Sequence, residues 1–153
     1  MDRLPRKLDI KPFKAEHAMQ LELRPEESEA KENLDLYKQF ADMRSLNGPA
    51  RSLYYQGKLL FCCGIILMCP GVGSAWIVCD KAIKGFGREC LYYTGKLLDE
   101  HIKQHKLHRV QAEIKSSVDC FHKFILRLGF EEEGTMRKYG PDESDYILYS
   151  RIT

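Results

Sequence analysis

The sequence predicts a mixed α/β domain built on one central β-sheet. Apolar and polar residues alternate strictly over residues 108–115, which is typical of a strand with one buried face. Leucine and isoleucine recur at helical spacing over residues 88–105, which indicates an amphipathic helix. Segments of both kinds follow one another along a chain of 153 residues, so we expect a single domain over residues 1–153.

The remaining elements follow from the same periodicities and from residues typical of element ends. Pro25 and the acidic residues after it favour the start of a helix. Gly57 predicts a hairpin turn, and we expect Ser117 to cap a helix that ends at Gly129. The expected order is strand 8–13, helices 14–23 and 24–43, strands 50–56, 58–68 and 74–80, helix 88–105, strand 108–115, helix 117–129, and strands 130–140 and 145–152.

The composition is that of an ordinary globular protein. Hydrophobic residues make up 44% and charged residues 30%, and the net charge of +2 gives no indication of nucleic-acid binding. The charged N-terminal residues do not resemble a signal peptide. Glycine and proline interrupt the apolar stretch 59–79, which therefore predicts two buried strands and not a membrane helix. We expect a cytoplasmic protein with no membrane partner.

Cysteine and histidine do not predict a metal site. The six cysteines include no pair with CxxC spacing, so we expect reduced thiols, most of them buried. Cys120 is expected to be one of these buried thiols and not a nucleophile. His101, His105 and His108 have helix-like spacing, but no acidic ligand accompanies them, so they are expected to lie on the surface.

A short glycine loop lies between strand 74–80 and helix 88–105. Gly85 and Gly87 alternate with Lys84, Phe86 and Arg88. The first amides of a helix lack internal partners and carry partial positive charge, and glycine lets a bound anion approach the backbone closely. The loop is therefore either a pyrophosphate site or only a turn that starts a helix.

Five short motifs follow one another in the second half of the chain: His108-Arg109, Leu128-Gly129-Phe130, Glu133-Gly134, Arg137-Lys138-Tyr139 and Leu148-Tyr149-Ser150-Arg151. With these motifs the second half closely resembles the GNAT acyltransferase superfamily. With the strand and loop before it, this similarity covers about residues 74–152, and the first half resembles phage-encoded GNAT-like proteins. It implies a GNAT-like fold with a bent, mostly antiparallel sheet and helices on both faces.

The resemblance implies that acetyl-CoA binds at the glycine loop. The family's pyrophosphate motif corresponds to residues 82–87, with both glycines present and Ala82 in place of the usual Gln or Arg. This context favours the anion site over the plain turn. The expected cofactor-binding residues are the strand positions Trp76, Ile77 and Val78 and the loop positions Lys84, Gly85, Phe86, Gly87 and Arg88.

The resemblance also implies catalytic residues. Glu113 falls where protein N-terminal acetylases have a glutamate that looks like the general base. Ile125 replaces the tyrosine that protonates the leaving thiolate in the family, and Val118 replaces the family's helix-opening asparagine. The proton donor to the leaving thiolate is then Tyr139 or Cys120.

The function expected from these features is an N-acyltransferase. It would move the acetyl group of acetyl-CoA to an amine of a small molecule or a protein by direct attack, without a metal. The alternative, which Ala82, Val118 and Ile125 favour, is a non-catalytic GNAT-like binding or structural protein, such as a phage virion or assembly component. That origin would place it in the host cytoplasm or the virion. A homodimer is possible through exposed sheet edges.

Overall fold

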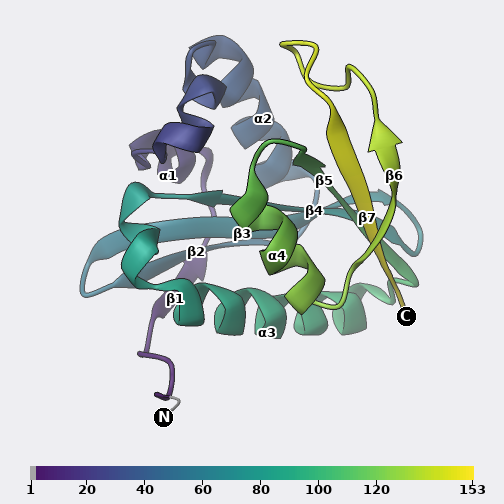
Figure 1. Cartoon of the computed structure of the whole chain (residues 1–153). Helices are drawn as coiled ribbons and strands as arrows, with labels where there is room; N and C mark the ends of the chain where they lie inside the picture. Colours follow the sequence, from purple (N-terminus) through teal and green to yellow (C-terminus); the bar gives the residue numbers. More distant parts are fainter. Residues whose placement is uncertain (1–2) are drawn as a thin grey trace.

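A computed structural model describes residues 3–153, apart from the side chains at positions 26, 28 and 29. These residues form one seven-stranded sheet and four α-helices, with two short 3-10 helices (Figure 1). The elements are β1 (Asp9–Pro12), α1 (Ala15–Gln20), η1 (Pro25–Lys31), α2 (Leu34–Leu46), β2 (Ala50–Tyr55), β3 (Lys58–Cys69), β4 (Val72–Cys79), η2 (Lys81–Gly85), α3 (Gly87–His105), β5 (Arg109–Lys115), α4 (Asp119–Arg127), β6 (Glu131–Met136) and β7 (Tyr146–Ile152).

The sheet has the strand order β1-β2-β3-β4-β5-β7-β6 and is mostly antiparallel. Neighbouring strands run antiparallel at every pairing of the described sheet except one, between β4 and β5. Helix α3 connects these two parallel strands, because a parallel pair needs a long crossover. The expected mixed α/β fold is confirmed.

Helices cover both faces of the sheet. Residues of α1 and α2 pack with Trp76 and Val78 of β4 on one face. Residues of α3 and α4 pack on the other face, where Val110 and Ala112 of β5 are buried. Figure 1 shows α3 running beneath the sheet and α1 and α2 above it. The alternation predicted for residues 108–115 is confirmed, because Val110 and Ala112 both lie in the core.

The predicted helix 24–43 is wrong, because the segment forms two helices. Residues Pro25–Lys31 form the 3-10 helix η1, and α2 begins only at Leu34. The Asn33 side chain accepts a hydrogen bond from the Leu36 amide at 3.1 Å and so caps the new helix. Ser117 is likewise not a cap: α4 begins at Asp119, after Val118.

Burial confirms some cysteine and histidine predictions and contradicts others. Four cysteines are buried, whereas Cys69 and Cys120 are exposed, so Cys120 is not the core thiol that was expected. His105 and His108 are exposed as predicted. His101 is only 2% exposed, and burial together with the charge of Arg51 lowers its pKa to about 4. His101 lies on the α3 face that packs against the sheet, which explains its neutral form.

Glu133 is expected to make folding stability depend on pH in the acid range. Arg109 donates two hydrogen bonds to this carboxylate, at 2.7 and 2.8 Å, and the Ser150 hydroxyl donates a third. Chiefly through the Arg109 hydrogen bonds, the pKa of Glu133 falls from 4.5 to about 2. A lowered pKa stabilises the fold above the unfolded value, and this stabilisation is lost as the pH falls from 4.5 towards 2.

Urea unfolding of Glu133→Gln and wild type across this pH range tests the expectation. The variant should be less stable at pH 7, and the difference should shrink as the pH falls below 4.5. Glu131→Gln, an exposed change on the same strand, is the control. A difference that stays constant with pH would show that the Arg109–Glu133 pair is not responsible.

Candidate active site

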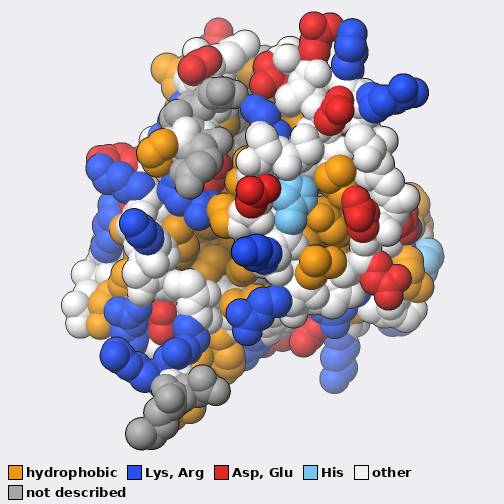
Figure 2. All heavy atoms as spheres, viewed as in Figure 1, with side chains coloured by type: hydrophobic (Ala, Val, Ile, Leu, Met, Phe, Trp, Pro, Cys, Tyr) orange, Lys and Arg blue, Asp and Glu red, His pale blue; other side chains and the backbone are white. Residues whose placement is uncertain are grey.

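The parallel strands β4 and β5 separate partway along their length. They pair only from Val72 to Ser74, opposite Arg109 to Gln111, although β4 continues to Cys79 and β5 to Lys115. Beyond Ser74 the backbone of β4 is therefore not paired with β5 along the edge that faces β5. Figure 2 shows a hollow between η2 and α4, with hydrophobic side chains deep inside and Lys and Arg side chains around it. We call the region where β4 and β5 are no longer paired, beyond Ser74 and Gln111, the β4–β5 split.

The predicted glycine loop lies at the wide end of the split. It forms η2 and the start of α3, and the N-cap residue Phe86 makes no side-chain capping bond. A Cβ atom added at Gly85 or Gly87 would meet no heavy atom within 4 Å, and neither glycine has a positive φ. The loop conformation therefore does not require glycine, and both positions face open space. That space suits a bound anion on the first amides of a 19-residue helix.

Asp80 anchors this loop, a role that the sequence analysis missed. It is 1% exposed, and its carboxylate accepts hydrogen bonds from the amides of Ala82 and Glu22, each at 2.9 Å. Burial alone would raise the pKa of Asp80, but these amides and Lys58 hold it below its ordinary value. An aspartate directly after a strand and before a helical turn is a common N-cap, and that signal was present in the sequence.

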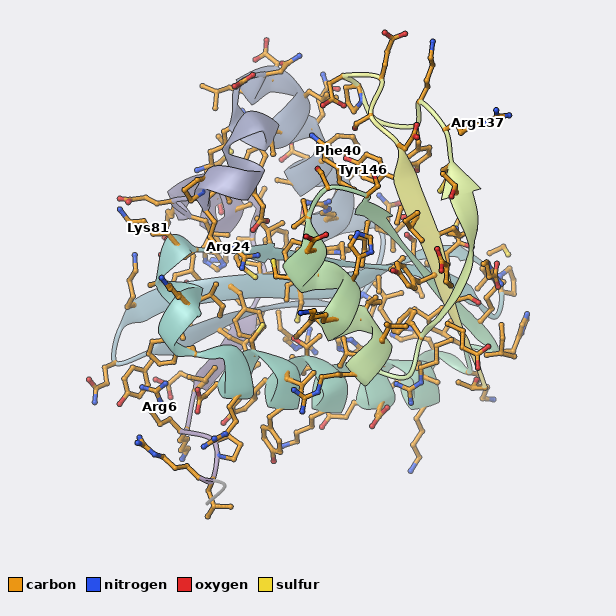
Figure 3. The ribbon with its side chains drawn as sticks, viewed as in Figure 1. Arg6, Arg24, Phe40, Lys81, Arg137 and Tyr146 are labelled. Carbon is orange, nitrogen blue, oxygen red and sulfur yellow. The ribbon has the colours of Figure 1, made fainter. Side chains whose placement is uncertain are left out.

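The N-terminal segment lies against the same loop. Arg6 donates to the Gly85 carbonyl oxygen at 2.5 Å and to Glu89 at 3.1 Å, and its guanidinium lies 4.0 Å from the centre of the Phe86 ring. Arg88 donates to the Arg3 carbonyl oxygen at 2.8 Å. The Arg88 side chain is therefore already engaged away from the loop amides, and Arg6, which Figure 3 labels beside the start of α3, adds a basic group that was not predicted.

Glu113 lies near the closed end of the split. Its carboxylate accepts hydrogen bonds from Ser74 Oγ at 3.4 Å and from Gln111 Nε2 at 3.2 Å, and Ser74 and Gln111 form the last paired position of β4 and β5. By the alternation of β5, Glu113 faces away from the core residue Val110, as expected.

Tyr139, the other predicted catalytic residue, lies close enough to Glu113 to respond to its charge. Tyr139 is 53% exposed, and its ring packs edge-on against Tyr146 at 5.3 Å. Partial burial, and then the negative charge of Glu113, raise the pKa of Tyr139 above its ordinary value. The tyrosine is therefore protonated at neutral pH and has a proton to donate.

The three predicted strand positions lie on β4 beyond the last paired residue. Trp76 and Val78 direct their side chains into the core under α1 and α2, and Ile77 packs on the opposite face. Their backbone groups on the β5 side lie along the split. Trp76 itself is 9% exposed and contacts the ring of Phe13 at 5.0 Å.

Arg24 reaches the split from the connection between α1 and η1, and nothing in the sequence pointed to it. Its Nε donates to Glu27 at 2.8 Å, and its guanidinium lies 4.9 Å from the centre of the Phe121 ring on α4. Burial would lower the pKa of Arg24, but Glu27 raises it above its ordinary value. Figure 3 shows Arg24 between η2 and α4, so this cation lies across the outer part of the split.

The positions that depart from the GNAT motifs are structural. Val118 and Ile125 are each 6% exposed, and Ile125 lies on the face of α4 that packs into the core. Ala82 packs against the core, and its amide donates to Asp80. Neither Val118 nor Ile125 carries a polar atom on its side chain, so any proton donor must come from elsewhere.

Solved structures share this fold over nearly the whole chain. A GNAT-family acetyltransferase from Bacillus anthracis superposes with a TM-score of 0.70 at 15% identity, covering 97% of this chain and 96% of its own. The chain has the GNAT fold. A ribosomal-protein-S5-alanine acetyltransferase from Vibrio fischeri (TM-score 0.68, 18% identity, 95% and 92% covered) has the same GNAT fold. So does a ribosomal-protein-alanine N-acetyltransferase from Brucella melitensis (TM-score 0.69, 16% identity, 94% and 99% covered).

At these identities the likeness shows the GNAT fold and not a substrate. No protein-family model matches the sequence, and no curated protein matches it significantly. Among the side chains that the structure describes, no group of three or more His, Cys, Asp or Glu is placed to hold a metal ion. None of the described helices is long and apolar enough to span a membrane.

Proposed function

We propose that this chain is an acetyl-CoA-dependent N-acyltransferase. The observation that carries the proposal is the β4–β5 split, which has a carboxylate near its closed end and an open helix N-terminus at its wide end. A long, thin cosubstrate with a thioester at one end and a pyrophosphate at the other fits this arrangement.

The residues at the wide end suit the pyrophosphate. The Phe86 side chain caps none of the amides that begin α3, and the space beside Gly85 and Gly87 leaves room for phosphate oxygens. Lys84 is exposed, and Arg6 lies beside the loop, so basic side chains are close by. Along the split, the backbone of Trp76, Ile77 and Val78 would form hydrogen bonds with the amides of the pantetheine arm, as an added strand would.

The residues near the closed end suit the proton transfers. Acetyl-CoA supplies a thioester, whose carbonyl carbon the acceptor nitrogen attacks as the carbon–sulfur bond breaks. Glu113 takes the proton that the nitrogen loses, directly or through water. Tyr139 donates its hydroxyl proton to the departing thiolate. The support for this pair is that Glu113 accepts hydrogen bonds from Ser74 and Gln111 at the last paired position of β4 and β5, and that its charge acts on Tyr139.

A second candidate function is binding without catalysis. It is favoured by the apolar, buried Val118 and Ile125 and by the engagement of Arg88 with the Arg3 carbonyl. Under this alternative the fold is retained and the chain serves as a binding or structural protein. The two candidates differ in whether acetyl-CoA is turned over when an amine is supplied.

Calorimetric titration with acetyl-CoA tests the proposal. We expect micromolar binding to wild type and a loss of about tenfold or more in Gly85→Glu, because a carboxylate would occupy the anion position. Gly85→Ala should bind normally, because its Cβ meets no neighbouring atom in the free protein. Absence of binding to wild type, or equal binding by Gly85→Glu, would overturn the pyrophosphate site.

A further inference from the structure

Helix α2 places a guanidinium, whose Nε is unpaired among the described residues, on the face of the sheet that Glu113 occupies. Arg44 lies in the last turn of α2, and its guanidinium carbon lies 4.9 Å from the centre of the Trp76 ring. The Nε of Arg44 is buried and has no hydrogen-bond partner in the described part of the chain. Figure 3 labels Phe40, one turn earlier on the same helix, whose ring lies 5.8 Å from this guanidinium.

The indole of Trp76 adds a second unpaired donor at the same place. Trp76 is 9% exposed, and its Nε1 also lacks a partner among the described side chains and backbone groups. A guanidinium and an indole N–H can only donate hydrogen bonds. Buried donors without acceptors are rare in folded proteins and destabilise them, so each such donor needs an explanation. A ligand that supplies acceptor oxygens would explain why these two unpaired donors lie in contact.

Among the side chains that the structure describes, no acidic group neutralises Arg44. The titratable groups that act on it are Tyr37 of its own helix and Cys62 of β3, and the described carboxylates form no ion pair with it. Burial lowers the pKa of Arg44 below its ordinary value, but an arginine remains charged at neutral pH. A partly buried cation with no counterion is a site for an anion, and a carboxylate matches the fork of a guanidinium.

Arg44 and Trp76 lie on the same side of the sheet as Glu113, where the amine substrate would bind. Ser74, which donates to Glu113, and Trp76 are two residues apart on β4, so their side chains lie on one face about 7 Å apart. An acceptor with its amine at Glu113 would therefore extend its other end towards Trp76 and Arg44.

We infer that the acceptor is an amine that also carries a carboxylate, such as a free amino acid, and that Arg44 and the indole N–H of Trp76 bind this carboxylate. The inference rests on the proposed function, which assigns Glu113 to the amine. It excludes polyamines, because Arg44 would repel a second positive charge at this end of the acceptor.

Trp76 is the chain's one tryptophan, so its fluorescence reports binding at this site directly. The probes are L-methionine, L-glutamine and L-leucine, each compared with its carboxamide, which keeps the amine and the side chain but lacks the carboxylate. We expect saturable fluorescence changes with the acids and none at the same concentrations with the carboxamides. Arg44→Gln should weaken binding of the acids by about tenfold or more, since a hydrogen bond to a charged group is lost.

Two further variants serve as controls. Lys38→Gln removes an exposed charge from the same helix and should leave binding unchanged. Arg44→Lys keeps the charge but not the planar fork, so its binding should be intermediate. Circular dichroism and thermal unfolding establish that each variant is folded. If Arg44→Gln does not fold, the carboxylate site is tested by comparing the binding of acids and carboxamides to wild type and to Arg44→Lys.

The outcomes separate this inference from the proposed function when acetyl-CoA is titrated into the same samples. Equal responses to acids and carboxamides, or wild-type affinity for acids in Arg44→Gln, overturn the carboxylate site. If acetyl-CoA binds in that case, the proposed function stands without it. Selective binding of acids together with no binding of acetyl-CoA supports the carboxylate site and overturns the proposed function.

Discussion

Replacing Glu113 with Gln is expected to lower kcat by about 100- to 10,000-fold, which is the usual contribution of a general base. Gln has the same shape as Glu and can still accept the hydrogen bond from Ser74, but it cannot take a proton at neutral pH. Acetyl-CoA affinity should stay unchanged, because the pyrophosphate loop lies at the other end of the split.

The assay follows the release of the CoA thiol from acetyl-CoA in the presence of an amine that wild type acetylates. It gives kcat for wild type and for Glu113→Gln. Glu100→Gln is the matched control, because Glu100 is exposed on α3. Turnover by Glu113→Gln within a factor of about three of wild type would exclude Glu113 as the base, since no proton-transfer role is that small. An unchanged affinity for acetyl-CoA beside a lost kcat would separate chemistry from cosubstrate binding.

Replacing Asp80 with Ala is expected to destabilise the fold and to disorder the cosubstrate loop together. The change leaves the amides of Glu22 and Ala82 without their acceptor and should lower the free energy of unfolding by about 2–4 kcal/mol. Because Ala82 belongs to η2, which leads into α3, acetyl-CoA binding should weaken as well.

Chemical denaturation and calorimetric titration at a temperature where the variant is folded measure the two effects. Asp80→Asn keeps one carbonyl oxygen and should show a smaller loss of both. Asp9→Ala, on the exposed strand β1, should be close to neutral. A loss of stability with unchanged acetyl-CoA affinity would show that Asp80 holds β4 in place but does not position the loop.

Much of the fold could be predicted because local patterns are strong where one face of an element is buried. The alternation over residues 108–115 predicted both a strand and the face on which Glu113 lies, since successive side chains point to opposite sides. Helix 88–105 and the turn at Gly57 were predicted within a residue or two. Helix 24–43 was not, because a composition rich in helix-forming residues does not reveal that Asn33 starts a second helix.

Exposure of single residues was harder to predict than the elements that hold them. Cys120 and His101 were each assigned to the wrong environment, because burial depends on which element packs against a helix face and not on residue type alone. The same limit applies to Arg88, whose side chain turns to a carbonyl group 85 positions earlier in the chain.

By itself, the sequence determined the order of strands and helices, the glycine loop at the start of α3 and the side of β5 on which Glu113 lies. These properties depend on neighbours within a few residues, through the periods of strands and helices and the chemistry of helix ends. Only the tertiary structure decided where β4 and β5 separate, that Asp80 anchors the loop, that Arg24 meets α4 and that Arg44 meets β4. Those features join residues tens of positions apart, and they exist only once the sheet and its helices have packed together.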